Sequence, residues 1–300
     1  MSAWLLSLEG TPQGHQLAMM LALSAAVLHA VFGALQKGRH DPWLSRGAID
    51  ISYGLMAAPF ALFVVPWPEP HMWVIFAGAF VIHLAYKLLQ AQAYTKGAYT
   101  VVYPVVRGTG PLFAVIGAYV IFNETFTWIQ WAGLGVLLMG IFGLALYNMV
   151  YLTAARETLT SALGLAVATG LFVALYTTYD AYGIRATADP FTFLAWFFMI
   201  DGFAMPILAV LRYRSMTYKP ALPPLALRGF IGGLIAFLSF GSVMMATRLD
   251  QVGEAAVLRE TSTVFAAIIG WVFLKETVGP RRIALMALIA LGAVIVEIGG

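Results

Sequence analysis

Several charged side chains lie inside apolar runs of this 300-residue sequence, where a charge needs a chemical reason. Three of them are basic: Lys87, Arg107 and Arg259. Placing an ionisable group in hydrocarbon costs at least about 2.5–3.5 kcal/mol, and such a group usually faces a cavity or an opposite charge. Guanidinium and ammonium groups bind carboxylates and phosphates. The three residues therefore predict either contact with an anion or ion pairs that hold helices together.

The surroundings of Arg107 favour an anion site. It stands in the run VVYPVVRGTGPLF, flanked by Pro104, Gly108, Gly110 and Pro111. Proline removes a backbone donor and glycine weakens a helix, so the run predicts an interrupted helix whose free carbonyls line a cavity. We expect the interruption to present the planar guanidinium to a bound anion. In the alternative interpretation, Arg107 pairs with an acid and joins the two halves without touching substrate.

Lys87 belongs to a group of polar side chains on one predicted helix. His83 lies one turn before it on the same face, and Gln90 is close by. Lys87 could be a second anion contact, or its amine could lose its proton if the site is dry. In the alternative interpretation it has a structural role as part of a pair. Two tyrosines near Arg107, four residues apart, are also candidates for the cavity wall. The predicted substrate-binding residues are Arg107, Arg259, Lys87, His83, Tyr103, Tyr99 and Gln90.

Acids inside the apolar runs are candidates for proton coupling. Asp201 lies in the middle of one run, and Glu260 directly follows Arg259. Asp180 lies in the polar stretch YTTYDAY near the end of another run. It could accept a proton or an ammonium group, or only bond tyrosine hydroxyls at the membrane edge. Asp50 is near the start of a run, where a structural role is expected.

The composition is that of a membrane protein. Hydrophobic residues make up 61% of the chain and charged residues only 10%, whereas soluble domains carry about 25% charged residues. The apolar runs are long enough to cross a bilayer. The net charge of +3 is spread over the loops, so nucleic-acid binding is not expected. We predict an all-α polytopic membrane protein with ten transmembrane helices over 17–37, 45–66, 71–95, 99–121, 127–149, 158–184, 190–212, 224–247, 253–274 and 279–299.

The second half of the sequence repeats the first at an offset of 152 residues. The matched pairs are Val105/Val257, Arg107/Arg259, Thr109/Thr261, Phe113/Phe265, Ala114/Ala266, Ile116/Ile268, Val120/Val272, Glu124/Glu276 and Thr125/Thr277. At a similar offset, Ile49-Asp50 matches Ile200-Asp201. We predict two five-helix repeats, 1–150 and 151–300. Because five is odd, the second repeat must enter the membrane upside down, an arrangement common in secondary transporters.

Basic residues predict the orientation in the membrane. Twelve lie in or next to the connections after odd-numbered spans: Lys37, Arg39, Arg46, Lys96, Arg156, Arg212, Arg214, Lys219, Arg228, Lys275, Arg281 and Arg282. Only Arg185 and Arg248 lie on the other side. Positive loops stay in the cytoplasm, so we expect the odd connections inside and both termini outside.

The sequence lacks the motifs of enzymes and of energy-coupling domains. It contains no H-E-x-x-H, no G-x-S-x-G and no phosphate-binding G-x-x-x-x-G-K-S/T loop. There is no cysteine, and the five histidines do not cluster along the chain. We therefore expect no catalytic site, no metal, no cofactor and no direct use of ATP.

The ten predicted spans resemble those of the drug/metabolite transporter superfamily, in particular its ten-span EamA-type branch. The similarity covers the whole chain and includes a signature seen twice, in which a fourth-span core ends in glutamate and a glycine-rich span follows. The first copy leads to Glu124 and the second to Glu276. Both lie at span ends, where a cap or tether is expected. The second copy has Thr263 where the first has Pro111, so the halves need not bend alike.

The resemblance implies a secondary carrier for a small polar metabolite in the cell (inner) membrane, working by alternating access between its halves. The buried bases favour an anion or zwitterion, such as an amino acid, an organic acid or a phosphonate-like compound. Proton coupling through Asp201, Asp180 or Glu260 is one option and uncoupled transport another. The alternatives are a multidrug or cation exporter, a non-transporting scaffold and an intramembrane lipid enzyme. The expected partners are substrate and lipid bilayer, with the chain as monomer or homodimer.

Overall fold

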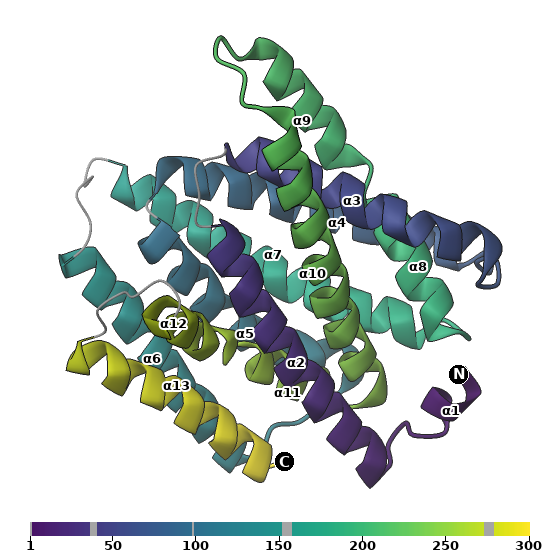
Figure 1. Cartoon of the computed structure of the whole chain (residues 1–300). Coiled ribbons are helices and arrows are strands. Elements are labelled where there is room, and N and C mark those ends of the chain that lie inside the picture. Colours follow the sequence, from purple (N-terminus) through teal and green to yellow (C-terminus); the bar gives the residue numbers. More distant parts are fainter. Residues whose placement is uncertain (1, 37–40, 98, 152–157, 273–278) are drawn as a thin grey trace.

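The computed structural model describes residues 2–36, 41–97, 99–151, 158–272 and 279–300. Over these residues the chain is helical, without any strand, and the predicted all-α membrane fold is confirmed (Figure 1). The helices are α1 (Ser2–Leu6), α2 (Pro12–Gln36), α3 (Pro42–Phe63), α4 (Met72–Lys96), α5 (Tyr99–Phe122), α6 (Trp128–Tyr151), α7 (Leu159–Arg185), α8 (Pro190–Asp201), α9 (Ala204–Ser215), α10 (Leu222–Leu249), α11 (Val252–Arg259), α12 (Ser262–Val272) and α13 (Pro280–Ile298).

Helix starts follow local sequence signals. Proline occupies one of the first two positions of α3, α8, α10 and α13, where its missing N–H removes no helical bond. Asp41 caps α3 by accepting hydrogen bonds from the N–H groups of Trp43 and Leu44, and Asp189 caps α8 by accepting one from Phe191. Each cap therefore marks the point at which a polar connection ends and an apolar helix begins.

Eight predicted spans correspond to one helix each, and the other two are each divided. The seventh span consists of α8 and α9, and the ninth of α11 and α12. Among the described residues, seven stretches of helix are long and apolar enough to cross a membrane, and one of them is α8 and α9 taken together. The observed helices are consistent with ten membrane crossings, and that number stays a prediction. We call the side with the connections after spans 1, 3, 5, 7 and 9 the odd-loop side, and the opposite side the even-loop side.

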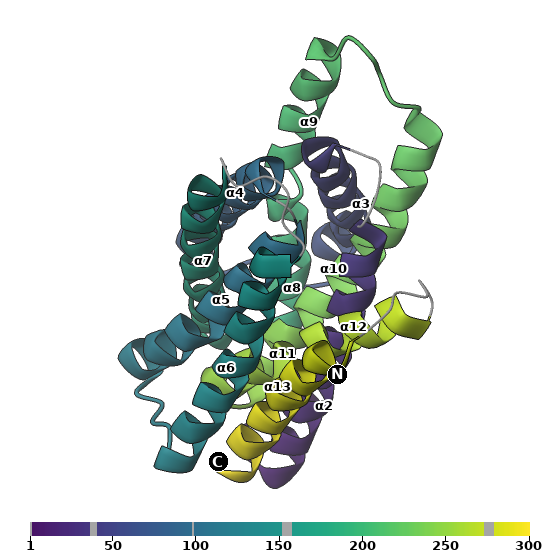
Figure 2. The ribbon, with the colours of Figure 1, turned by 90° about the vertical axis from the view of Figure 1, so that its left-hand side faces the viewer.

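The helices pair in a two-fold symmetric pattern. Each of α3 and α6 packs against its own counterpart, α8–α9 and α13 respectively. The pairs α2–α10 and α4–α7 exchange with each other when every span is replaced by its counterpart. In Figures 1 and 2, α6 and α13 lie side by side at one edge of the bundle, and α3 and α9 at the opposite edge. This is the pairing expected if a two-fold axis relates the first five spans to the last five.

The predicted interruption beside Arg107 is wrong, because α5 is continuous from Tyr99 to Phe122. Its glycines serve helix packing. A Cβ added to Gly108 would lie 3.0 Å from the ring of Phe142 in α6, and one added to Gly110 would lie 3.1 Å from Val173 in α7. The interruption occurs in the second repeat instead, where α11 ends at Arg259 and α12 begins at Ser262. Short hydrogen-bonded turns between these helices replace the regular helical pattern.

Candidate functional site

A cavity lies between the two halves of the bundle. Its volume is about 20 Å³, which is enough for one or two water molecules. Six helices contribute basic, aromatic and amide side chains to it: His29, Phe32, Arg46, Tyr86, Gln90, Tyr94, Tyr103, Val106, Arg107, Val173, Tyr176 and Phe240. These described lining residues include no acid. This cavity, which we call the first cavity, therefore presents positive charge and aromatic surface together.

The first cavity leads toward the odd-loop side. Arg46 and Tyr94 lie near the connections on that side, and both are partly exposed. The deeper lining residues Arg107, Tyr86 and Tyr176 are buried. Exposure thus falls along the cavity from the odd-loop side toward the middle of the bundle.

Arg107 both lines the first cavity and holds the two halves together. Its Nε lies 2.9 Å from Oε2 of Glu260, and its Nη2 donates to the hydroxyl of Ser262 at 2.5 Å. The same nitrogen lies 3.3 Å from the carbonyl oxygen of Arg259, which the interruption between α11 and α12 leaves free of a regular helical bond. The sequence offered an anion site and an ion pair as alternatives for Arg107, and this geometry combines an ion pair with a place in a cavity wall.

Arg259 lines a second, smaller cavity of about 10 Å³ on the even-loop side. Its Nε lies 3.7 Å from Oε1 of Glu260, and its Nη2 lies 3.5 Å from the hydroxyl of Thr177. Glu260 is fully buried, and its carboxylate lies between Arg107 and Arg259, the equivalent arginines of the two repeats. The carboxylate also lies at the interruption, where the backbone does not hold it in a regular helix.

Tyr176 and Phe240 line both cavities. Tyr176 belongs to α7 and Phe240 to α10, and their ring centroids are 6.1 Å apart. The two rings therefore form a partition between the first and the second cavity.

Lys87 lies in a buried ion-pair network rather than in either cavity. Its ammonium group donates to Asp50 at 2.6 Å and to Asp201 at 2.7 Å, and it also donates to the hydroxyl of Tyr53 at 2.9 Å. Tyr53 in turn donates to the other oxygen of Asp201 at 2.5 Å. Of the alternatives that the sequence left open for Lys87, the structure shows the pairing with buried acids.

Close packing of α3 and α8 brings the two acids of this network together. Asp50 and Asp201 are the equivalent acids of the two repeats. A Cβ added to Gly202 would lie 2.8 Å from the Cα of Gly54, so the backbones touch at this crossing. Arg46, one turn before Asp50, completes the network with an Nε–Oδ1 distance of 2.9 Å. This contact connects the network to the wall of the first cavity.

His83 and Asp180 form a second buried pair, with 2.8 Å between Nε2 and Oδ2. The imidazole ring also packs against Tyr176, at 4.6 Å between centroids. Asp180 lines the second cavity, and its Oδ1 is buried without a hydrogen bond from any described residue. The membrane-edge interpretation of Asp180 therefore does not describe this buried position.

Of the three remaining predicted substrate contacts, two line the first cavity and one has a side chain outside the described part of the chain. Gln90 lines the first cavity and donates to the hydroxyl of Tyr86 at 2.7 Å. Tyr103 lines it too, with its ring 5.7 Å from the guanidinium of Arg107. Tyr99 begins α5, but its side chain lies outside the described part of the chain.

Glu124 serves as a cap. Its two carboxylate oxygens accept hydrogen bonds from the N–H groups of Val252 and Gly253 at the start of α11, and one of them lies 3.2 Å from Arg185. The predicted cap or tether is therefore present, although the helix it serves belongs to the other repeat. Glu276 falls outside the described residues.

Sequence reasoning missed Arg46 as a cavity residue because it was counted with the positive loops. The available signal was its spacing from Asp50: a basic residue four positions before an acid on a helix commonly forms a pair. It also missed Tyr176 and Phe240, because aromatic residues are frequent throughout such a sequence and nothing in their spacing marks a partition.

Two regions of the chain, residues 16–146 and 160–298, match the sequence profile of the EamA-like transporter family. No curated protein matches the sequence significantly. Among solved structures, one crystal structure of a protein superposes with a TM-score of 0.74 at 16% sequence identity, and the match covers 94% of this chain and 96% of that one. At this identity the similarity shows a common fold.

Proposed function

Because the chain belongs to the EamA-like transporter family, we propose that it is a secondary carrier for a small anionic or zwitterionic metabolite. Membership makes it a multi-pass membrane transporter. Amino acids, organic acids and phosphonate-like compounds are the candidate substrates. We assign no enzymatic reaction to the chain, and we place it in the inner membrane as a monomer or homodimer.

The charge of the first cavity carries the proposal. Arg46 and Arg107 reach its wall from different helices, and its described lining contains no acid. Their partners, Asp50 and Glu260, are buried outside this lining. A planar guanidinium binds a carboxylate or phosphate through two parallel hydrogen bonds. An anion that enters from the odd-loop side would therefore meet a group suited to it.

Glu260 occupies the place that such an anion would take at Arg107. The first cavity is far smaller than the roughly 300–1,000 Å³ of a ligand site, so substrate can bind only if side chains or helices move. We propose that the substrate's anionic group replaces the Glu260 carboxylate at Arg107. One ion pair would then be exchanged for another, so that the buried guanidinium is never left without a counter-charge.

Alternating access follows from the proposed repeats, 1–150 and 151–300. Their equivalent arginines, Arg107 and Arg259, line different cavities, and Glu260 lies between them. In one state Glu260 neutralises Arg107, and in the other, Arg259. The partition of Tyr176 and Phe240 would open in step with this exchange. The distribution of basic residues supports placing the odd-loop side in the cytoplasm and both termini outside.

For proton coupling, the surroundings favour Asp180 over Asp201 and over Glu260, which is paired with Arg107 and Arg259. Asp201 accepts hydrogen bonds on both carboxylate oxygens from Lys87 and Tyr53. Asp180, in contrast, faces the second cavity with one oxygen that accepts no hydrogen bond from the described residues. A proton that enters the second cavity can reach this oxygen without first breaking an ion pair to lysine.

A cation exporter is the second candidate, because Asp180 offers an acid in the second cavity. In that case the bound ligand would be a lipophilic cation, and Arg107 would only join the two halves. The charge of the two cavities thus separates the candidates, since each would recruit a ligand of opposite sign.

Thermal unfolding of the purified protein in detergent tests the proposal. The ligands are amino acids, organic acids, phosphonates and lipophilic cations, since any compound that binds only the folded state raises the unfolding temperature. We expect an anion or zwitterion to stabilise the protein, and the double variant Arg107→Gln/Glu260→Gln to lose that effect. The double change removes both charges, so that no unpaired carboxylate remains to destabilise the fold.

Arg212→Gln is the matched control. Arg212 also pairs with a carboxylate, that of Asp41 at 3.1 Å, but it lies at the exposed end of α9. This variant should keep the full ligand response. Stabilisation by cations alone, unchanged in the double variant, would refute anion transport and support the cation exporter.

A further inference from the structure

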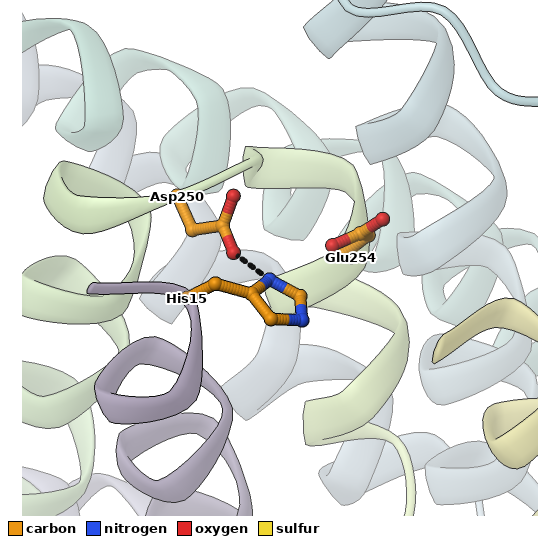
Figure 3. A group of neighbouring side chains, drawn as sticks. All are labelled: His15, Asp250 and Glu254. Atoms are coloured by element: carbon orange, nitrogen blue, oxygen red, sulfur yellow. Dashed lines mark hydrogen bonds and ion pairs between the residues drawn. The ribbon is translucent and has the colours of Figure 1, made fainter. Parts of the chain in front are cut away.

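A second polar site lies on the even-loop side, away from both cavities described above. Four side chains from separate parts of the sequence meet there: His15 of α2, Asp250 between α10 and α11, Glu254 of α11 and Glu297 of α13. Figure 3 shows His15, Asp250 and Glu254 pointing toward one another. The three offer nitrogen and oxygen atoms that all lie within 4.8 Å of one another. The fold thus gathers one imidazole and three carboxylates.

Both nitrogens of the imidazole face carboxylates. Nδ1 of His15 contacts Oδ2 of Asp250, and Nε2 lies 3.3 Å from Oε1 of Glu297. Glu254 accepts a hydrogen bond from the amide of Gln130 at 2.6 Å. Carboxylates that contact a histidine fix its ring and raise its basicity as a ligand, as they do in metal sites.

These side chains border a small space of about 10 Å³ that is partly open to the surface, because the side chain of His15 is 43% exposed. Two of its lining oxygens, Oε1 of Gln251 and Oε2 of Glu297, are buried and accept no hydrogen bond from the described residues. Buried acceptors nearly always have a partner. The space holds one particle of the size of a water molecule or a single ion, and either would satisfy these oxygens.

Charge distinguishes between the two occupants. Within the described part of the chain, no lysine or arginine pairs with the carboxylates of Asp250, Glu254 or Glu297. Arg185 and Arg248, which lie nearby, are paired with Glu124 and Glu9. With His15 neutral, as a metal ligand must be, three ionised carboxylates carry a charge of −3. A divalent cation would reduce that charge to −1, whereas a water molecule would leave it unchanged.

We propose that His15, Asp250, Glu254 and Glu297 bind one divalent transition-metal ion. Imidazole nitrogen suits Zn²⁺ and its neighbours, whereas Mg²⁺ and Ca²⁺ prefer oxygen alone. Bonds of about 2.0–2.2 Å place the ligand atoms of a tetrahedral site about 3.3–3.6 Å apart. The atoms of His15, Asp250 and Glu254 lie within 4.8 Å of one another, so their side chains must shift toward the ion to complete the site. The sequence predicted no metal because residues 15, 250 and 297 are far apart along the chain. The ion would join the even-loop ends of α2, α11 and α13.

Calorimetric titration of the full-length protein tests this inference. The protein is purified in detergent, its affinity tag is removed and the buffer is metal-free, and Zn²⁺, Mn²⁺, Mg²⁺ and Ca²⁺ are added in separate titrations. We expect one Zn²⁺ or Mn²⁺ per chain, with a rise in unfolding temperature, and at least tenfold weaker binding of Mg²⁺ and Ca²⁺. The variants His15→Gln and Glu254→Gln should each weaken Zn²⁺ binding at least tenfold. Both retain hydrogen-bonding groups, so the bundle should still fold.

His71→Gln is the control. His71 also lies on the even-loop side, 3.3 Å from the carboxylate of Glu69, but has no cluster around it. Its replacement should leave Zn²⁺ binding unchanged. Binding of Zn²⁺ by His15→Gln with unaltered affinity and stoichiometry would overturn the proposal. The proposal would also be overturned if no metal binds and Glu254→Gln stabilises the metal-free protein, because the cluster would then hold a proton instead.

Discussion

Arg107 and Arg259 occupy equivalent positions 152 residues apart, yet each lines a different cavity. The carboxylate of Glu260 lies within 4 Å of both guanidinium groups, at 2.9 Å from Arg107 and 3.7 Å from Arg259. No acid occupies the equivalent position of the first repeat, where Gly108 follows Arg107. One acid therefore pairs with two arginines. Because the two repeats differ in this way, substitutions can test the role of each of the three residues.

Replacing Glu260 by glutamine should increase the affinity for an anionic substrate about tenfold, because the competing carboxylate at Arg107 is gone; that factor corresponds to about 1.4 kcal/mol. Net transport should fall, since no charge remains to exchange between the arginines. Binding is measured by ligand-dependent unfolding and transport by uptake into liposomes. Weaker anion binding in Glu260→Gln would contradict the exchange, because it would make Glu260 part of the binding site itself.

Replacing Lys87 by methionine should destabilise the protein without removing substrate binding. Asp50 and Asp201 would be left as buried acids with fewer partners, at a cost of about 3–5 kcal/mol. The unfolding temperature should fall, while the rise produced by a saturating anion persists. Lys219→Met, at an exposed position beyond α9, should change neither. A Lys87→Met protein of normal stability that no longer responds to the anion would instead make Lys87 a substrate contact.

A second substitution in the buried network of Lys87 tests whether the loss of stability comes from broken ion pairs. The double variant Lys87→Met/Asp201→Asn should recover part of the lost stability, since Asp201, the acid left without a counter-charge, is removed with the lysine, while Asp50 keeps its pair with Arg46. Measured together, the single and double variants separate an ion-pair effect from a packing defect at the same site. Equal unfolding temperatures for the two would point to packing.

Asp180→Asn should abolish accumulation of substrate driven by a proton gradient and leave exchange of substrate for substrate intact. Asparagine keeps the shape of the side chain but cannot take up and release a proton. Both activities are measured in liposomes, one with an imposed pH gradient and one with substrate on both sides. Gradient-driven uptake at the normal rate in Asp180→Asn would exclude this residue as the proton carrier. Glu69→Gln, at an exposed loop position, is the control.

The orientation can be tested with single cysteines, because the natural sequence has none. Ser7 follows α1 near the N-terminus, and Ser215 ends α9 on the odd-loop side; both are exposed. A membrane-impermeant maleimide added to intact cells should label Ser7→Cys and spare Ser215→Cys. Permeabilised cells should show labelling of both. The reverse pattern in intact cells would place the odd connections outside.

The sequence was sufficient for features that depend on composition and repetition. Apolar runs predicted the helices, and the matched arginines predicted two related halves. Burial of Lys87, Arg107 and Arg259 also followed, because each is an isolated charge in an apolar run. All three are at most 5% exposed.

Features that depend on helix crossings could not be predicted. Pro104 and Gly108 indicated a broken α5, but the close approach of α6 and α7 uses the glycines for contact. Lys87 finds its partners only because Gly54 and Gly202 let α3 and α8 touch. His15 and Glu297 meet because α2 begins on the side on which α13 ends, which no local pattern expresses.

The self-paired helices have a consequence for the history of such a chain. Since α3 packs on α8–α9 and α6 on α13, two free copies of a five-helix ancestor could assemble through the same surfaces. Such a dimer would supply one lysine from each copy to the pair of central aspartates. In this chain Lys87 contacts both aspartates, Arg46 also pairs with Asp50, and α10, the counterpart of the helix that carries Lys87, has no lysine. The two halves of this chain are therefore not interchangeable at the network, because the lysine comes from the first half alone.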